Sequence, residues 1–212
     1  DDHLKLDYDK LQETMQQNLQ ELKYIDIRNG LELQDYYRTD LHWKQENLGE
    51  VVKIIQGNMK LDEMNATYEI QNKGEFYGTY YGQLSTNVTP DNISILTNET
   101  ISNCIVYNYE TNKKSSIYTT TNSADKYDIF LSGAVSLISI ENPNSKTEKE
   151  LLLFRDSFGS SLAPLLVENY KKITLIDLRY ISSSILENYI DFNEQDVLFL
   201  YSSVVLNQNI LK

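Results

Sequence analysis

Cysteine and histidine are scarce in this sequence, and their scarcity limits the chemistry that the chain can support. One cysteine, Cys104, and two histidines occur among 212 residues. No intrachain disulfide can form, and no cluster has the spacing of a familiar metal site. Glycine-rich phosphate loops and dinucleotide fingerprints are absent as well. We therefore expect no metal and no cofactor, and we expect Cys104, which lies in an apolar run, to be a buried and inert thiol.

Basic residues are outnumbered by acidic ones, which excludes some classes of partner. The formal net charge is −12, whereas nucleic acid must be met by lysine and arginine. The same imbalance disfavours an anionic membrane surface. No run of 18 consecutive apolar residues occurs, so we expect no membrane-spanning segment. An acidic surface suits a protein that meets neutral substrates, although it is also typical of simple solvation.

The chain is long enough for one domain of ordinary size, and 41% of its residues are hydrophobic. We treat residues 1–212 as a single domain and expect an N-terminal part of the natural chain to lie upstream. The sequence contains 16 tyrosines. Their apolar faces and polar tips suit sugar-binding clefts, but tyrosine-rich β-strands account for them too.

Hydrophobic periodicity predicts helices over 8–23 and 45–56, with a short strand over 24–27 between them. From about residue 67 to 140 the pattern changes to short β-like runs separated by polar turns. These runs cover 76–81, 101–109, 116–120 and 135–140. We interpret this region as a β-rich insertion or meander that flanks the main sheet.

The C-terminal part has a clearer pattern. Short apolar runs at 151–154, 173–177 and 197–201 alternate with helical patterns at about 160–170 and 182–190. This order predicts an α/β domain with a central parallel sheet and right-handed crossovers. Functional groups on such sheets gather at the carboxyl ends of the strands. Ser157 follows the first of these strands, so we expect it at such an end.

Ser157 is the candidate nucleophile. A serine hydroxyl becomes competent when a base removes its proton and backbone N–H groups receive the oxyanion. The turn from strand to helix exposes Ser157 beside the amides of a helix N-terminus, where the dipole favours negative charge. The alternative is that Asp156 or Ser157 only caps the helix.

His42 is the candidate base, because the other histidine, His3, lies at the chain terminus. Asp40 lies two residues earlier, and residues i and i+2 of an extended segment face the same side. The Asp40 carboxylate can then accept from the Nδ1–H of His42 and leave Nε2 facing the serine. The alternative is a surface aspartate beside a satisfied histidine, since Asp-x-His often arises by chance.

A set of ordered motifs resembles the bacterial DHHW protein family. The segment 36–43, Tyr-Tyr-Arg-Thr-Asp-Leu-His-Trp, resembles the signature of that family. The stretches at 126–131, 151–158 and 176–180 resemble its C-terminal half, and 196–201 continues the match. The family is similar in turn to the alginate O-acetyltransferase group, whose SGNH-like domains carry an Asp-x-His-Trp-type pair upstream of the serine.

The resemblance implies a three-layer SGNH-hydrolase-like domain in which Asp40, His42 and Ser157 match triad positions. It implies a serine esterase or O-acetyltransferase outside the cytoplasm, with a cell-envelope or secreted polysaccharide and an acyl donor as partners. The alternative is a non-catalytic carbohydrate-binding or scaffold protein on the same fold. A structural or adhesive role has no sequence repeat to support it.

Two positions depart from the family pattern. Leu41 stands where the name-giving motif has histidine, and alternation turns position 41 away from the site. Residues 132–136 stand where the family tends to have a Gly-Gly-Asn-His-Pro-like segment. If that asparagine binds the oxyanion, this chain lacks one donor, and we expect weak activity.

Gly78 and Arg179 are secondary candidates. The amide of Gly78 could face the oxyanion, whereas a β-bulge is a structural reason for a glycine at this place. Arg179 could orient a substrate carboxylate or phosphate, or it could form an ion pair with Asp177 or another nearby acid.

Overall fold

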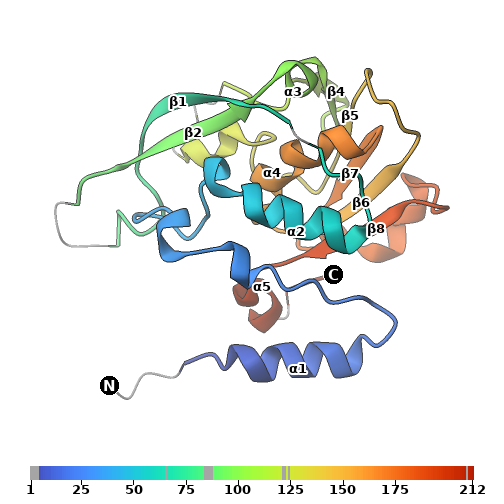
Figure 1. The fold of residues 1–212 in the computed structure, drawn as a ribbon, viewed down its shortest axis with the longest axis horizontal. Coiled ribbons are helices and arrows are strands. Elements are labelled where there is room, and N and C mark those ends of the chain that lie inside the picture. The colour runs from blue at the N-terminus through green and yellow to red at the C-terminus, as the bar shows by residue number, and fades with distance from the viewer. Residues whose placement is uncertain (1–4, 65, 84–87, 121–122, 124, 209) are drawn as a thin grey trace.

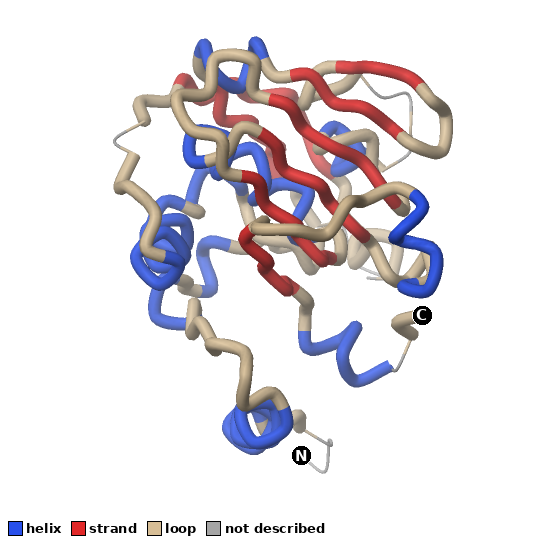
Figure 2. The backbone as a smooth tube through the Cα atoms, turned by 90° about the vertical axis from the view of Figure 1, so that its right-hand side faces the viewer, coloured by secondary structure: helices blue, strands red, loops and turns tan. Residues whose placement is uncertain are grey.

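A mixed sheet forms the centre of the protein, and a separate two-stranded ribbon lies beside it (Figure 1). The computed structural model describes residues 5–64, 66–83, 88–120, 123, 125–208 and 210–212, so His3 lies outside the described residues. Within the described residues the strand order of the main sheet is β4-β3-β5-β7-β6-β8, and β1 pairs with β2. Figure 2 shows the strands lying side by side.

The C-terminal half of the main sheet is parallel. β6 (Glu150–Arg155) lies between β7 (Lys172–Ile176) and β8 (Asp196–Leu200) and pairs in parallel with both. The prediction that these three runs form parallel strands of one sheet is therefore confirmed, and the first two strands are buried while β8 is partly exposed. β6 ends two residues before Ser157, which places the candidate nucleophile at the carboxyl edge of this half.

The other half of the sheet is antiparallel, which corrects the prediction of a central parallel sheet. It consists of β3 (Ile105–Asn108), β4 (Lys113–Ser115) and β5 (Leu137–Glu141). β5 pairs antiparallel with β7 and with β3, and β3 pairs antiparallel with β4. The connection between β3 and β4 covers only 109–112, which is too short for the crossover that a parallel pair needs.

The ribbon consists of β1 (Glu69–Phe76) and β2 (Asp91–Thr97), which pair antiparallel. The region interpreted as a flanking insertion is thus divided, because β3, β4 and β5 belong to the main sheet. The strand predicted over 76–81 is wrong: β1 ends at Phe76, whose side chain is fully buried. The run at 116–120 forms no strand and contributes an isolated bridge at Tyr118.

Helices surround the sheet and are mostly short. The α-helices of the described residues are α1 (Tyr8–Asn18), α2 (Gly49–Met59), α3 (Glu99–Asn103), α4 (Phe158–Leu162) and α5 (Ser203–Gln208). The 3-10 segments are η1 (Arg28–Gly30), η2 (Leu33–Asp35), η3 (Gln45–Asn47), η4 (Lys126–Ile129), η5 (Ala163–Asn169) and η6 (Ser183–Asn188). No helix in the described ranges is long and apolar enough to cross a membrane.

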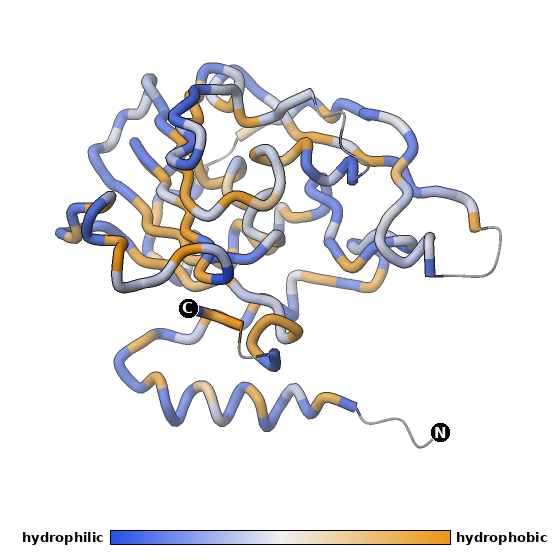
Figure 3. The backbone as a smooth tube through the Cα atoms, turned by 180° about the vertical axis from the view of Figure 1, so that it is seen from behind, coloured by the Kyte–Doolittle hydropathy of each residue, from blue (hydrophilic) through white to orange (hydrophobic). Residues whose placement is uncertain are grey.

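The N-terminal helix α1 stands apart from the rest of the fold (Figures 1 and 3). Asp7 caps it by accepting a hydrogen bond from the Lys10 N–H at 3.0 Å. The helix ends at Asn18 rather than at 23, and none of its residues is buried. The strand predicted over 24–27 is absent, because this segment pairs with no other strand. Its side chains Ile25 and Ile27 still pack against the core.

Apolar side chains cover both faces of the main sheet. Leu151 and Leu153 of β6 belong to a cluster with α2 and η5, whereas Leu152 and Phe154 belong to a second cluster with η6. Successive strand residues point to opposite faces, so an unbroken apolar run indicates burial on both. Cys104 lies in the first cluster, which confirms that it is buried, and this burial raises the pKa of the thiol to about 12.

Candidate active site

Ser157 lies in the turn between β6 and α4, and Asp156 holds this turn in place. One carboxylate oxygen of Asp156 accepts from the Phe158 N–H at 3.0 Å, and the other accepts from the Ser202 N–H at 2.7 Å. The Ser157 side chain makes no capping hydrogen bond. Asp156 therefore takes the capping role, and the Ser157 hydroxyl remains for another partner.

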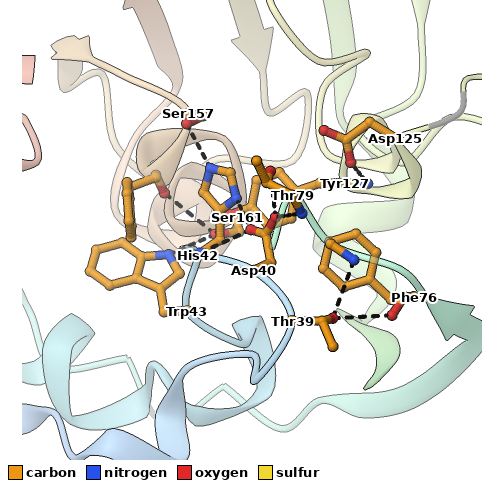
Figure 4. A network of polar contacts seen from close by, with 12 residues as sticks. Thr39, Asp40, His42, Trp43, Phe76, Thr79, Asp125, Tyr127, Ser157 and Ser161 are labelled. Atoms are coloured by element: carbon orange, nitrogen blue, oxygen red, sulfur yellow. Dashed lines mark hydrogen bonds and ion pairs between the residues drawn. The ribbon is translucent and has the colours of Figure 1, made fainter. Parts of the chain in front are cut away.

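That partner is His42. The Nε2 atom of His42 lies 2.7 Å from the Oγ of Ser157, and its Nδ1 lies 2.5 Å from the Oδ1 of Asp40 (Figure 4). His42 and Asp40 are buried, whereas Ser157 is partly exposed. The structure thus brings a hydroxyl, an imidazole and a carboxylate into one continuous line of contacts that ends at the surface.

The Asp40–His42 pair forms through a bend and not through the extended segment that the sequence analysis assumed. The His42 N–H donates to the Oδ1 of Asp40 at 3.0 Å, which is the local bond that favours aspartate in turns. The Tyr37 N–H donates to the His42 carbonyl at 3.0 Å, and Tyr36 bridges Trp43. These contacts close residues 36–43 into a small loop that carries the pair.

Thr79 completes the surroundings of Asp40. Its N–H and its Oγ1 donate to the Oδ2 of Asp40 at 2.8 and 2.9 Å. Burial by itself raises the pKa of the Asp40 carboxyl, but the hydrogen bonds from the His42 ring and from Thr79 outweigh it and lower the pKa to about 2. Asp40 is therefore charged at any ordinary assay pH and fixes the proton of the imidazole on Nδ1.

Gly78 lies against the backbone that carries Asp40. A Cβ atom at Gly78 would come within 2.3 Å of the Asp40 Cβ and 2.4 Å of the Thr39 carbonyl oxygen. The Gly78 N–H already donates to the Thr39 Oγ1 at 3.2 Å. Close packing therefore explains this glycine, which is in neither a strand nor a bulge, and we do not carry the suggested oxyanion role of its amide further.

We expect Gly78→Ala to destabilise the protein by about 3 kcal/mol, because the new methyl group must displace backbone atoms. The free energy of unfolding, measured with urea, checks this result. Gly82→Ala is the matched control, since a Cβ there meets nothing within 4 Å, and it should change stability by less than about 0.5 kcal/mol. Equal stabilities of the two variants would contradict the close approach of Gly78 to Asp40.

Aromatic rings enclose the imidazole of His42. The Tyr127 ring stacks on it with a centroid distance of 3.9 Å and an interplanar angle of 13°. The Phe158 ring lies 4.9 Å from it at an angle of 50°. The imidazole is thus held between an apolar face on one side and the nucleophile turn on the other.

Other kinds of site are not found at this place. No group of three or more His, Cys, Asp or Glu side chains comes together as metal ligands in the part of the chain that the structure describes. A groove of about 750 Å³ lies elsewhere, between β1, β2, α3 and residues 116–118. The contacts of Ser157, His42 and Asp40 therefore suit acid–base and nucleophilic chemistry that these side chains perform themselves.

A protein family model matches most of the chain. Residues 9–176 match the DHHW protein family. The chain belongs to the DHHW family. No curated protein matches it.

Solved structures resemble this DHHW family chain over most of its length. A DHHW family protein from Eubacterium siraeum DSM 15702 is 22% identical, with a TM-score of 0.71 over 100% of this chain and 79% of that one. Bacillus cereus PatB1 is 21% identical, with a TM-score of 0.62 over 82% of this chain and 64% of that one. PatB1 with a sulfonyl adduct is 20% identical, with a TM-score of 0.62 over 95% and 70%. At these identities the likeness is one of fold.

Residues 132–136, where the resemblance leads one to expect an asparagine, lie beside the turn that carries Ser157. The Val135 carbonyl accepts from the Arg155 guanidinium at 3.3 Å, and the Ser136 carbonyl accepts from the Asp177 N–H at 2.9 Å. Ser132 and Gly133 have φ angles of 64° and 79°, which is the left-handed region. The segment is thus tied to the carboxyl ends of β6 and β7 without the asparagine that the resemblance leads one to expect.

Arg179 pairs with Asp177, as the structural alternative predicted. Its Nε and Nη2 atoms donate to the two carboxylate oxygens of Asp177 at 2.9 and 2.7 Å. Arg155, which is fully buried, approaches the same carboxylate to 3.7 Å. The bidentate pair engages two donors of Arg179. A role for Arg179 in binding substrate stays a prediction.

Three contributing residues, Thr79, Tyr127 and Ser161, were missed by the sequence analysis. Thr79 was assigned to a strand, and its bonds to Asp40 depend on the chain turning after Phe76. Tyr127 lies in a stretch that carried the family resemblance, but nothing in its local pattern indicated a contact with His42. Ser161 lies one helical turn after Ser157, and that spacing is the signal that could have indicated it.

Proposed function

We propose that this chain is a serine-dependent acyl-transfer enzyme, an esterase or O-acetyltransferase on an SGNH-like, three-layer α/β domain. The observation that carries the proposal is the line of contacts from Ser157 Oγ to His42 Nε2 at 2.7 Å and from His42 Nδ1 to Asp40 at 2.5 Å. A nucleophile within reach of a base, whose other nitrogen is held by a third group, is the arrangement that activates serine.

In the proposed reaction the Ser157 Oγ attacks the acyl carbonyl carbon while His42 Nε2 accepts the hydroxyl proton. Asp40 stabilises the resulting imidazolium. The tetrahedral intermediate collapses to an acyl-serine, and His42 returns the proton to the leaving oxygen. Water or a sugar hydroxyl then attacks the acyl-serine with His42 again as the base, and Ser157 is regenerated.

The proposed oxyanion donor is the backbone N–H of Ser157. Among the described residues this N–H has no hydrogen-bond partner, so it is available to a developing negative charge. A second donor from 132–136 is not part of the proposal, because that segment has no asparagine. We therefore propose an enzyme of low intrinsic activity toward simple esters.

The proposed acyl acceptor is a cell-envelope or secreted polysaccharide, which implies a protein outside the cytoplasm with partners in the cell envelope. The resemblance to the alginate O-acetyltransferase group motivates this assignment. A neutral polymer also avoids the repulsion that the net charge of −12 imposes on acidic substrates. The surface position of Ser157 allows a hydroxyl of a long chain to approach from solvent.

Covalent labelling tests the nucleophile directly. PatB1 has been solved with a sulfonyl adduct, and we expect methanesulfonyl fluoride to sulfonylate Ser157 here, with loss of fluoride and of the hydroxyl proton. Intact-mass and peptide mass spectrometry should find one sulfonyl group per chain on that residue. Ser157→Ala and His42→Ala should not be labelled, whereas Ser160→Ala, a neighbouring serine control, should label like wild type. Labelling that survives in Ser157→Ala would contradict the proposal.

The non-catalytic alternative predicts a different pair of results. In that case the wild-type chain would neither be labelled nor turn over several acyl donors, yet it would bind a polysaccharide. Both measurements use the same protein preparation, so the outcome separates an enzyme from a carbohydrate-binding module.

A further inference from the structure

The hydroxyl of Ser161 is a meeting point for the groups that surround His42. It accepts hydrogen bonds from the Trp43 Nε1–H and from the Tyr127 hydroxyl, each at 2.8 Å, and it donates to the Phe158 carbonyl at 3.3 Å. Ser161 is fully buried, and Tyr127 and Trp43 are nearly so. One buried oxygen thus uses its hydrogen and both of its lone pairs in hydrogen bonds.

Each partner of this hydroxyl is attached to a different part of the site. Trp43 follows His42 directly in the chain, Tyr127 stacks on the His42 ring, and Ser161 lies on the helix that begins after Ser157. The side-chain NH₂ group of Gln45 donates a hydrogen bond to the Ser161 backbone carbonyl at 2.8 Å. The loop that carries the base and the helix that follows the nucleophile are therefore joined through Ser161 at both its hydroxyl and its backbone.

We propose that Tyr127 and Ser161 are positioning residues for His42, in which the Tyr127 ring fixes the imidazole plane and the Ser161 hydroxyl holds that ring in register with the nucleophile. Among the described residues neither side chain forms a hydrogen bond with Ser157 Oγ, so both would act through His42. The catalytic meaning of this pair rests on the proposed function, but the geometric claim concerns the ring of His42 itself.

The proposal makes the two hydroxyl groups interdependent. Ser161→Ala leaves two buried donors, the Trp43 Nε1–H and the Tyr127 hydroxyl, without an acceptor. Tyr127→Phe removes one of these donors and keeps the stacked ring. The double variant should therefore be no worse than Ser161→Ala alone, because the second change removes a group that the first has left unpaired.

The test uses four variants: Tyr127→Phe, Tyr127→Leu, Ser161→Ala and the double variant Tyr127→Phe/Ser161→Ala. Hydrolysis of an activated acetyl ester should fall by about 10-fold in Tyr127→Phe. It should fall by about 100-fold in Tyr127→Leu, which removes the stacked ring and allows the base to shift. These losses should appear in kcat with KM unchanged, since both residues are proposed to act through His42.

Two matched controls are available in the same core. Tyr170→Phe removes the hydroxyl of another buried tyrosine, which donates to Asp196 Oδ2 at 3.0 Å at the start of β8. Ser160→Ala removes a buried serine hydroxyl next to Ser161. Both should retain kcat within about 2-fold, which separates positioning of the base from general loosening of the core.

A second readout does not depend on turnover. The proton resonances of the His42 ring, measured by NMR, report the stacked Tyr127 ring, and His3 is the one other histidine. We expect these resonances to move in Tyr127→Leu and Ser161→Ala and to stay near wild type in both controls. If the wild type is inactive, the proposed function fails while this readout still judges the positioning pair. Unchanged His42 resonances in Ser161→Ala, which keeps the Tyr127 ring, would overturn the inference, because the loss of the ring alone shifts them in Tyr127→Leu.

Discussion

Replacing Ser157 or His42 by alanine is expected to lower hydrolysis of an activated acetyl ester by about 1,000-fold or to the uncatalysed background, whichever is reached first. Each change removes one end of the 2.7 Å contact between the hydroxyl and Nε2. The wild type itself should be slow, because a missing oxyanion donor typically costs on the order of 100- to 1,000-fold in rate. Initial rates with 4-nitrophenyl acetate measure the difference.

The double variant distinguishes a site that acts as a unit from two separate contributions. A nucleophile without its base and a base without its nucleophile are both idle, so Ser157→Ala/His42→Ala should be barely slower than either single variant. Ser160→Ala again serves as the control that should keep wild-type rates. Equal rates for wild type and Ser157→Ala would mean that the observed hydrolysis owes nothing to this site.

Replacing Asp40 by asparagine is expected to lower kcat by about 300-fold, less than the loss in His42→Ala, because the carboxylate acts only through the base. Asp40 accepts four hydrogen bonds, two from His42 and two from Thr79. An asparagine offers one oxygen and one NH₂ group. Either the two His42 donors or the two Thr79 donors must then face the NH₂ group, which cannot accept a hydrogen bond. The imidazole then loses the tautomer that leaves Nε2 free to accept the serine proton. Activity over a range of pH measures the loss.

The loss in Asp40→Asn should be similar across the assay range, because the pKa of the wild-type carboxyl is about 2 and the group does not titrate there. Thr79→Val is the milder comparison: it deletes the 2.9 Å hydroxyl bond and keeps the backbone bond to the same oxygen. That change should cost about 10-fold or less. Thermal unfolding of both variants checks that they remain folded. An Asp40→Asn rate within 10-fold of wild type would show that the carboxylate does not hold the base.

The sequence predicted the parallel half of the sheet because the evidence for it is local. A short unbroken apolar run such as 151–154 is typical of a strand buried on both faces. The evidence for the Asp40–His42 pair is local as well. The two residues are only two positions apart, and their side chains meet here in a bend. The order of motifs then placed Ser157 at the carboxyl end of β6.

The antiparallel half could not be predicted in the same way. All residues of β4 are exposed, so Lys113–Ser115 carries no apolar pattern, and β5 finds its partner β7 only through the tertiary fold. The roles of Gly78 and Thr79 depend on a close approach to a segment 39 positions away. Such approaches leave no periodic trace in the chain, and a single glycine or threonine is compatible with many local conformations.

The separation of the base from the nucleophile has a consequence for how this protein folds. His42 and Ser157 are 115 positions apart in the chain. The hydrogen bonds of Trp43 and Gln45 to Ser161 join residues with similar separations along the chain. Closing so long a stretch of chain costs entropy that only the finished core repays. The β3–β4 hairpin and α2 can form from local contacts while the site does not yet exist. The arrangement of Ser157, His42 and Asp40 is therefore a property of the complete topology, and the catalysis proposed for it requires the fully folded chain.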